Sequence, residues 1–348
     1  MNNVLKFNNI KILDTDIIFD VFRSIKYNSL VCICNNKHLI KHTTNINIFD
    51  IKIKSDNRQY DIEFIKLNDY ILYETNKNIR ESLYDGYDIE ICYIKDFPDS
   101  INEVQLQLGD FNIDIHIEPL DTRFHTKKCI STIQKNETHL IESWINYYTK
   151  FGFDCFFIYD NNFNIENYTE LLLKYKDVLF IYDMNFPYWI RNCYDLRRIG
   201  QFIQLNHSLW KFSPEFLGLF DLDEYISLKK DINIFDKNIS VLSFPNYWFG
   251  CNNNADYDYT NFIYKLNKRE ASINTHYQRK CIHQSKYVDL VCVHNALNIV
   301  GEYKRLTHDE GYLRHYIILS ERQRKCECDR YCQVDDIIHE FNGGCQNF

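Results

Sequence analysis

The spacing of apolar and polar residues divides the chain into two parts. In the first part, up to about residue 120, short apolar runs alternate with polar breaks, and stretches with a helical period are scarce. This pattern is typical of short β-strands. We therefore expect a β-rich N-terminal accessory domain over residues 1–120 and a second domain over residues 121–348. The apolar runs lie at residues 29–34, 46–53, 70–73, 87–94 and 111–117.

In the second part, expected strands alternate with expected helices. A β-branched, largely uncharged run over residues 128–134 predicts a buried strand, and the apolar residues from Leu140 to Phe151 recur at helical spacing. Further strands are expected at residues 155–159 and 178–182, and a last one ends at Asp221. Right-handed strand–helix–strand crossovers of this kind build a mostly parallel sheet. The fold class is therefore α/β, with ligands expected at the carboxyl ends of the strands.

The most informative motif follows the apolar run 216–220: Asp221 and Asp223 are separated by one residue. Alternate side chains of an extended segment point the same way, so both carboxylates are expected on one face at the end of a buried strand. Mg²⁺ or Mn²⁺ is commonly held by one or two carboxylates together with water and substrate phosphate oxygens. The pair therefore predicts a metal site that binds a nucleotide diphosphate. Asn136 and Asp160 follow other expected strands and should reach the same crevice.

The composition disfavours several functions. The 40 basic and 48 acidic residues give a formal net charge of −8, so the chain lacks the basic surface that nucleic acid or an anionic membrane attracts. No stretch approaches the roughly 20 apolar residues of a membrane span, and no apolar leader is visible. Thirteen cysteines without a pairing rhythm fit a reducing, cytoplasmic location. The cluster Cys326, Cys328 and Cys332 departs from the usual zinc spacing, so free thiols are preferred.

Several segments resemble, in order, the motif blocks of glycosyltransferase family 92. The resemblance covers residues ~125–330 and implies a GT-A fold, a UDP-sugar donor, a divalent metal, and inversion at the anomeric carbon. The family's known transfer moves galactose from UDP-galactose, so a hexose, galactose or glucose, is expected to pass to a hydroxyl of a glycan or protein-linked acceptor. The blocks are residues 129–137 (CISTIQKNE), 142–148 (ESWINYY), 151–161 (FGFDCFFIYDN), 220–226 (FDLDEYI), 248–250 (WFG), 293–294 (VH) and 313–316 (LRHY), the last continuing to Ser320 and Lys325.

The resemblance also implies roles for the metal ligands. Asp223 would bind Mn²⁺ or Mg²⁺ directly, and Asp221 would bind the ribose or the metal through water. GT-A enzymes commonly add a histidine from the C-terminal part of the chain. His294, which follows an apolar strand, is the first choice for this ligand, and His315 is the alternative.

The donor pocket is expected to involve residues from three segments. Asp160 suits the two ribose hydroxyls because a carboxylate can accept from both. Helix capping by Asn136 and Glu137, and a turn at Asp160 and Asn161, are the structural alternatives. The donor-binding residues implied by the resemblance are Asn136, Glu137, Asp160 and Asn161 for the uridine, with Arg197 or Arg198 for the diphosphate.

The acceptor side is less defined by the sequence. Tyr247, Trp248 and Gly250 are expected near the acceptor sugar, although core packing suits the large aromatic residues equally well. A carboxylate must take the acceptor proton. Glu224 is expected to face away from Asp223 if the strand continues, which favours packing. The candidate bases are therefore Asp256, Asp258, Asp309 and Glu310, and the sequence does not choose among them.

Two alternatives stay open. A sugar-phosphate nucleotidyltransferase can use a similar fold and paired acids, but such enzymes usually carry a Gly-rich loop after the first strand, and residues 131–137 contain no glycine. A catalytically silent carbohydrate-binding pseudoenzyme is the second alternative. Eukaryotic relatives are usually membrane-tethered, so the expected cytoplasmic location points to a large DNA virus or a protist. The acceptor and the oligomeric state are not readable.

Overall fold

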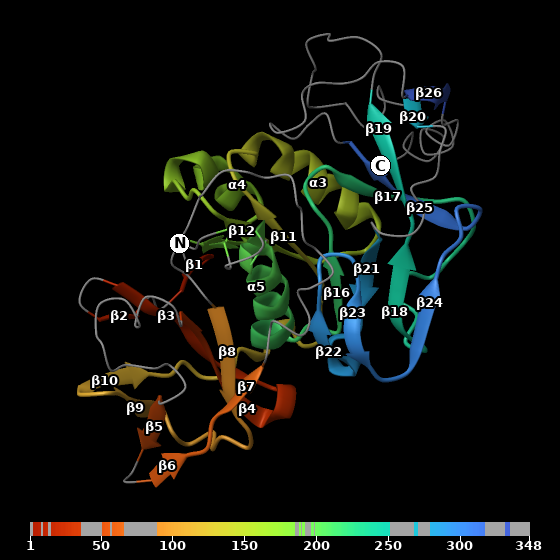
Figure 1. Cartoon of the computed structure of the whole chain (residues 1–348). Helices are drawn as coiled ribbons and strands as arrows, with labels where there is room; N and C mark the ends of the chain where they lie inside the picture. Colours follow the sequence, from red (N-terminus) through yellow and green to blue (C-terminus); the bar gives the residue numbers. More distant parts are fainter. Residues whose placement is uncertain are drawn as a thin grey trace. The chain divides into compact units, whose positions relative to one another are not determined.

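The computed structural model (Figure 1) gives two compact units, each described by itself below. The first unit comprises residues 1–126, 159–163 and 180–214, and the second comprises residues 127–158, 164–179 and 215–348. The residues that the structure describes are 3–7, 10–12, 15–35, 51–55, 58–65, 89–184, 188, 190–191, 196–197, 199–250, 268–270, 279–316 and 331–334.

The N-terminal part of the first unit is built from antiparallel strands, which confirms the prediction of a β-rich region. One sheet has the order β2 (Ile10–Ile12), β3 (Thr15–Ser24), β4 (Ser29–Asn35), β8 (Ile89–Ile94) and β7 (Glu63–Ile65). The other has the order β10 (Phe111–His116), β9 (Glu103–Leu108), β5 (Lys52–Ser55) and β6 (Arg58–Tyr60).

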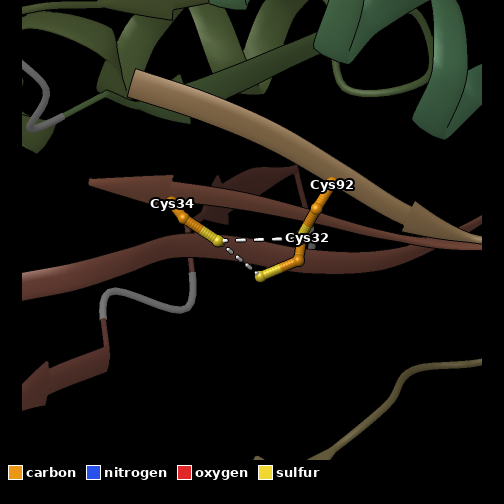
Figure 2. A group of neighbouring side chains, drawn as sticks. All are labelled: Cys32, Cys34 and Cys92. Atoms are coloured by element: carbon orange, nitrogen blue, oxygen red, sulfur yellow. Dashed lines mark hydrogen bonds between the residues drawn. The ribbon is translucent and has the colours of Figure 1, made fainter. Parts of the chain in front are cut away.

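Three buried cysteines pack inside this β-rich part (Figure 2). Cys32 and Cys34 lie two residues apart on β4 and therefore share a face, and Cys92 of β8 lies opposite Cys32. The sulfur atoms are 3.2 Å apart between Cys32 and Cys34 and 3.8 Å apart between Cys34 and Cys92. Hydrogen bonds with Cys32 and Cys92, together with burial, hold the pKa of the Cys34 thiol well above its usual value. The Cys34 thiol is therefore neutral at pH 7, whereas hydrogen bonds with Cys32 and Cys34 lower the pKa of the Cys92 thiol to about 5. All three side chains belong to the apolar core of this part.

A buried polar network lies elsewhere in the first unit. Helix α5 (Ile199–His207) continues into the π-helix η5 (Ser208–Phe212), and this segment carries His207 and Lys211. The Asp20 carboxylate lies 2.9 Å from both His207 Nε2 and Lys211 Nζ. Burial alone would raise the pKa of Asp20, but the two basic partners outweigh it and lower that pKa. Burial lowers the pKa of His207 to about 4, so its ring is neutral at pH 7 and also bonds the Tyr159 hydroxyl at 2.7 Å.

An α/β architecture is confirmed by the large mixed sheet. The described pairings are parallel for β1–β13, β11–β16 and β18–β24, and antiparallel for β16–β21 and β18–β21. The eight strands have the order β1 (Val4–Lys6), β13 (Leu179–Asp183), β12 (Cys155–Asp160), β11 (Lys128–Gln134), β16 (Phe216–Leu219), β21 (Lys280–His283), β18 (Ile239–Phe244) and β24 (Glu302–Arg305).

Helix α3 (Thr138–Lys150) joins β11 to β12 and packs an aromatic face into the second unit. Trp144, Tyr147 and Tyr148 are buried, because apolar residues three and four apart share one face of a helix. The expected cap is wrong in detail: Glu137 is the N-cap and makes no side-chain capping bond, while Asn136 has a φ of 61°. The shorter helix α4 (Thr169–Lys174) follows the 3₁₀ turn η4 (Ile165–Tyr168). Among the described residues, no helix combines the length and apolar character needed to cross a membrane.

A second sheet of the second unit carries several residues of the candidate site. Strands β17 and β25 are antiparallel, and β19 and β25 are parallel. Gly311, the first residue of β25, lies opposite Leu228 of β17. A Cβ atom at Gly311 would lie 2.9 Å from Leu228 Cδ2 and 3.0 Å from the carbonyl oxygen of Ser227, so only glycine fits there. The strand order is β17 (Glu224–Leu228), β25 (Gly311–His315), β19 (Asn246–Gly250), β20 (Lys268–Glu270) and β26 (Tyr331–Val334).

The buried Asp20 network predicts a large stability loss on truncation. We expect Asp20→Ala to lower the free energy of unfolding by about 3–5 kcal/mol, because it leaves the ammonium group of Lys211 without its buried partner. Urea unfolding followed by circular dichroism measures this loss. The control is Asp99→Ala, which removes a carboxylate that is 82% exposed beside Arg23 and should change stability by less than about 1 kcal/mol. Equal losses in the two variants would contradict the prediction.

Candidate functional site

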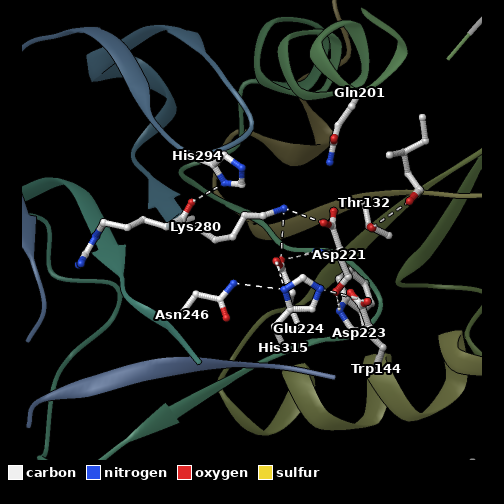
Figure 3. Close-up of polar contacts among 12 residues, drawn as sticks. Thr132, Trp144, Gln201, Asp221, Asp223, Glu224, Asn246, Lys280, His294 and His315 are labelled. Carbon is white, nitrogen blue, oxygen red and sulfur yellow. Dashed lines mark hydrogen bonds and ion pairs between the residues drawn. The ribbon is translucent and has the colours of Figure 1, made fainter. Parts of the chain in front are cut away.

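The two aspartates of the motif lie in a turn and not on an extended strand. Strand β16 ends at Leu219 and β17 begins at Glu224, so Asp221 and Asp223 occupy the tight connection between them. The expectation that they extend the preceding strand is therefore wrong. The turn is closed by a hydrogen bond from the Glu224 amide to the Asp221 carbonyl at 3.0 Å, and the Trp144 indole donates to the same carbonyl at 3.2 Å. Figure 3 shows the side chains around this turn.

Three carboxylates of the turn differ in exposure. The side chain of Asp221 is 34% exposed, that of Asp223 is 12% exposed, and that of Glu224 is 1% exposed. The Glu224 side chain points towards Asp221, because its carboxylate accepts a hydrogen bond from the Asp221 amide at 2.8 Å. It therefore belongs to the acidic cluster, because the chain turns at Asp223 where the sequence suggested a continuing strand.

Lys280 supplies a buried positive charge to this cluster. Its strand β21 is antiparallel to β16, with Gly218 opposite Ile282, so the first residue of β21 reaches the turn. Lys280 Nζ lies 2.8 Å from Asp221 Oδ2 and 3.3 Å from Glu224 Oε2. Burial opposes ionisation of the amine, but the two carboxylates outweigh it and raise the pKa of Lys280. Burial also opposes ionisation of Asp221 and would raise its pKa. Lys280 outweighs this effect, so the pKa of Asp221 is lowered.

His315 lies against Asp223. It is the last residue of β25, opposite Glu224 of β17, and its Nε2 is 3.2 Å from Asp223 Oδ2. Its Nδ1 is 3.3 Å from the amide nitrogen of Asn246 and 3.9 Å from Glu224 Oε1. Burial would lower the pKa of His315, but the attraction of Asp223 outweighs it and raises that pKa to about 9. The strand pairing thus brings an imidazole and two carboxylates together.

The pKa of Glu224 shifts in the opposite direction from that of Asp221. Burial raises its pKa to about 7, with Lys280 opposing the shift and the charges of Asp221 and Asp223 adding to it. The cluster therefore contains a carboxyl group that changes charge near neutral pH. No signal in the sequence distinguished Glu224 from an ordinary packed residue.

The other histidine of the motif analysis lies in a nearby turn. His294 is in the connection between β22 (Val288–Val291) and β23 (Ala296–Ile299), and its Nδ1 is 3.3 Å from the carbonyl oxygen of Arg279. Against the effect of burial, Lys280 first, and then His315 and His294, lower the pKa of Asp221. The direct contact with the motif is made by His315, the alternative ligand in the sequence analysis.

The expected donor-binding residues are distributed between the two units. Asn136 and Glu137 follow β11 in the second unit, and the Glu137 amide donates to Gln134 Oε1 at 2.8 Å. Asp160 and Asn161 belong to the first unit, where Asp160 accepts from the Asn162 amide at 2.9 Å and Asn161 donates to the Met184 carbonyl at 3.1 Å.

Some of the residues expected to bind the diphosphate and the acceptor lie on described strands, and others lie outside the described residues. Arg197 lies in the two-residue strand β15 (Leu196–Arg197), and Arg198, Asp256 and Asp258 lie outside the described residues. Tyr247 is buried against Tyr312 and His308, Trp248 is partly exposed, and Gly250 ends β19. Asp309 is exposed, and Glu310 accepts from the amide and hydroxyl of Thr307, both at 2.9 Å.

The sequence was compared with models of known protein families. The model of glycosyltransferase family 92 matches residues 127–342, more than half of the chain. The chain belongs to glycosyltransferase family 92. This confirms the resemblance drawn from the motif blocks and supports a transferase that uses a sugar donor and an acceptor. The family 92 region contains the D-x-D turn together with Lys280 and His315. No curated protein sequence matches the chain.

The contacts of Lys280 predict how the stability of the protein depends on this buried charge. We expect Lys280→Met to lower the free energy of unfolding by about 3–5 kcal/mol at pH 8, because the carboxylates of Asp221 and Glu224 lose their buried cation. Without Lys280, the folded-state pKa of Asp221 should rise above its unfolded value and that of Glu224 should rise further. The variant should therefore lose stability as the pH increases, and its deficit should be smaller at pH 5.

Urea unfolding at the two pH values tests this expectation. The matched control is Lys286→Met, which removes an exposed lysine of the same unit that packs over the Tyr287 ring. This control should change stability by less than about 1 kcal/mol at either pH. A Lys280→Met deficit that is the same at pH 5 and pH 8 would contradict the electrostatic role.

Proposed function

We propose that this family 92 chain is a metal-dependent, inverting glycosyltransferase of the GT-A fold. It moves a hexose, galactose or glucose, from a UDP-sugar to a hydroxyl group of a glycan or protein-linked acceptor. The observation that carries the proposal is the convergence of Asp221, Asp223 and His315 at one turn, with His315 Nε2 3.2 Å from Asp223 Oδ2. Family membership and the mixed α/β sheet support it.

The side chains at the turn fit a divalent cation. Asp223 and His315 offer an oxygen and a nitrogen that already face each other, and a carboxylate and an imidazole both suit Mn²⁺. Asp221, whose Oδ2 is paired with Lys280, is the more exposed carboxylate and would bind the metal through water or bind the ribose. We therefore assign Asp223 and His315 as metal ligands, with His294 as the alternative imidazole. The metal, when bound, would stabilise the charge that develops on the departing UDP, an effect worth several kcal/mol.

The protein residues would prepare the site before the donor binds. Lys280 holds Asp221 and Glu224 in place and keeps a fixed positive charge beside the proposed diphosphate position. Fixed charges of this kind need no reorganisation during the reaction, so their stabilisation is retained in the transition state. For an inverting transfer, a carboxylate such as Asp309 or Glu310, or Asp256 or Asp258, would take the proton of the acceptor hydroxyl.

The remaining assignments follow the family resemblance. We infer that the uridine binds through Asn136, Glu137, Asp160 and Asn161, and that Arg197 or Arg198 neutralises the diphosphate. The acceptor sugar would lie near Trp248 and Gly250, with Tyr247 behind them. The partly exposed Trp248 offers an aromatic ring to the acceptor, whereas the buried Tyr247 supports that strand from within.

Removal of the metal-binding carboxylate tests the proposed reaction. We expect Asp223→Asn to lower the Mn²⁺-dependent turnover of UDP-galactose or UDP-glucose by about 10²–10³-fold, because several kcal/mol of charge stabilisation are lost at about 1.4 kcal/mol per tenfold. The release of UDP measures turnover. The control is Asp231→Asn, which neutralises an exposed carboxylate between β17 and β18 and should leave the rate unchanged.

Donor identity is measured by thermal shift with UDP-, GDP- and CMP-sugars, each with and without Mn²⁺. A ligand at a hundredfold excess over its dissociation constant stabilises the folded state by about 2.7 kcal/mol, so the correct base and the need for metal appear together. Stabilisation only by UDP-sugars with Mn²⁺ supports the proposal. Binding of glycans without any donor turnover would instead favour a silent carbohydrate-binding protein. Synthesis of a nucleotide sugar from a sugar phosphate would favour a nucleotidyltransferase.

A further inference from the structure

The two ring nitrogens of His315 face different kinds of partner. Nε2 faces the Asp223 carboxylate at 3.2 Å, and Nδ1 faces the side-chain amide of Asn246 at 3.3 Å. Asn246 pairs with Leu313 in the parallel β19–β25 ladder, two residues before His315, so Asn246 and His315 lie on the same face of the sheet. The backbone of two paired strands therefore fixes this contact.

Asn246 is buried and incompletely hydrogen-bonded. The residue is 4% exposed, and its side-chain Oδ1 atom has no hydrogen-bond partner among the residues that the structure describes. A buried carbonyl oxygen without a partner is destabilising, because it has lost its hydrogen bonds to water without replacement. The oxygen and nitrogen of an amide exchange places by a half-turn of the group, and coordinates alone do not distinguish them. Asn246 can therefore present either a donor or an acceptor to His315 Nδ1.

A histidine that binds a metal must lose its extra proton, and the two orientations of the amide correspond to the two forms of the resulting neutral imidazole. When the amide nitrogen donates to Nδ1, the proton lies on Nε2 and points at Asp223. When the amide oxygen accepts from Nδ1–H, Nε2 has a free lone pair on the side of Asp223, which is the form that binds a metal. Histidines that bind metals generally donate their other ring N–H to a carbonyl or carboxylate oxygen.

We propose that Asn246 is a positioning residue that selects the metal-binding form of His315. Its amide oxygen accepts the Nδ1–H of His315 and directs the Nε2 lone pair to the divalent cation shared with Asp223. This inference rests on the proposed function, because it requires a metal at the turn. It adds a residue to the site that no sequence motif marked, and it predicts an effect on metal affinity in the absence of any donor.

The test measures Mn²⁺ binding by calorimetry on the full chain without a sugar nucleotide. We expect Asn246→Leu, which preserves approximate size but removes the acceptor, to weaken Mn²⁺ binding by about 10–100-fold. Asn246→Asp keeps an acceptor and should bind Mn²⁺ at least as tightly as the wild type. The matched control is Gln284→Met, which removes a buried amide of the same unit that donates to the Lys237 and Ile239 carbonyls. It should leave Mn²⁺ affinity unchanged.

A second measurement separates hydrogen bonding from the added charge of the aspartate. Nitrogen-15 NMR of the histidine rings in the diamagnetic Mg²⁺ complex should show the His315 proton on Nδ1 in the wild type and in Asn246→Asp. An Nε2 proton in the Mg²⁺ complex would overturn the proposal, whether or not Asn246→Leu is well folded. Unchanged Mn²⁺ affinity in folded Asn246→Leu would also overturn it.

The controls distinguish failure of this inference from failure of the proposed function. If the wild type binds Mn²⁺ and Asp223→Asn does not, while Asn246→Leu binds normally, only the role of Asn246 is wrong. If the wild type binds no Mn²⁺, both the metal-dependent reaction and the positioning role are wrong.

Discussion

The site depends on the balance between one buried lysine and the carboxylates of a short turn. Asp221, Asp223 and Glu224 would repel one another in a region that is largely removed from water. The ammonium group of Lys280 contacts two of them, and the His315 ring contacts the third. A cluster of like charges is stable in a protein interior only when such partners are present. The geometry of the turn is therefore tied to strands β21 and β25, which supply the basic residues.

The same balance bears on the proposed divalent cation. Lys280 interacts with the side of the cluster formed by Asp221 and Glu224, while Asp223 and His315 face each other on the other side. A cation that binds between Asp223 and His315 would not need to displace Lys280. The carboxyl group of Glu224, whose pKa burial raises to about 7, would allow the cluster to change its charge if the proposed cation binds. Lys280 and the proposed divalent cation could thus occupy the cluster together.

The sequence predicted the class of fold and the position of the aspartate motif, but it did not predict the conformation of the motif. Alternating periodicity was sufficient for the β-rich N-terminal region and for the α/β sheet, because each strand and helix buries one recognisable face. The bend at Leu222 and Asp223 was missed, since an apolar run followed by acids looks like a strand that continues. Lys280 and Asn246 were missed for a different reason: strand pairings between residues about 65 positions apart bring them to the site, and no local pattern records such pairings.

Gly311 shows how a residue without any side chain can influence the chemistry of this protein. It fits against Leu228 at the start of β25, and His315 lies at the other end of the same strand, opposite Glu224. Adjacent residues of a strand point to opposite faces, so a shift of one position would turn the imidazole away and bring Arg314 or Tyr316 to its place. An insertion or deletion in the loop before β25 would therefore keep His315 beside Asp223 only if Gly311 stays opposite Leu228.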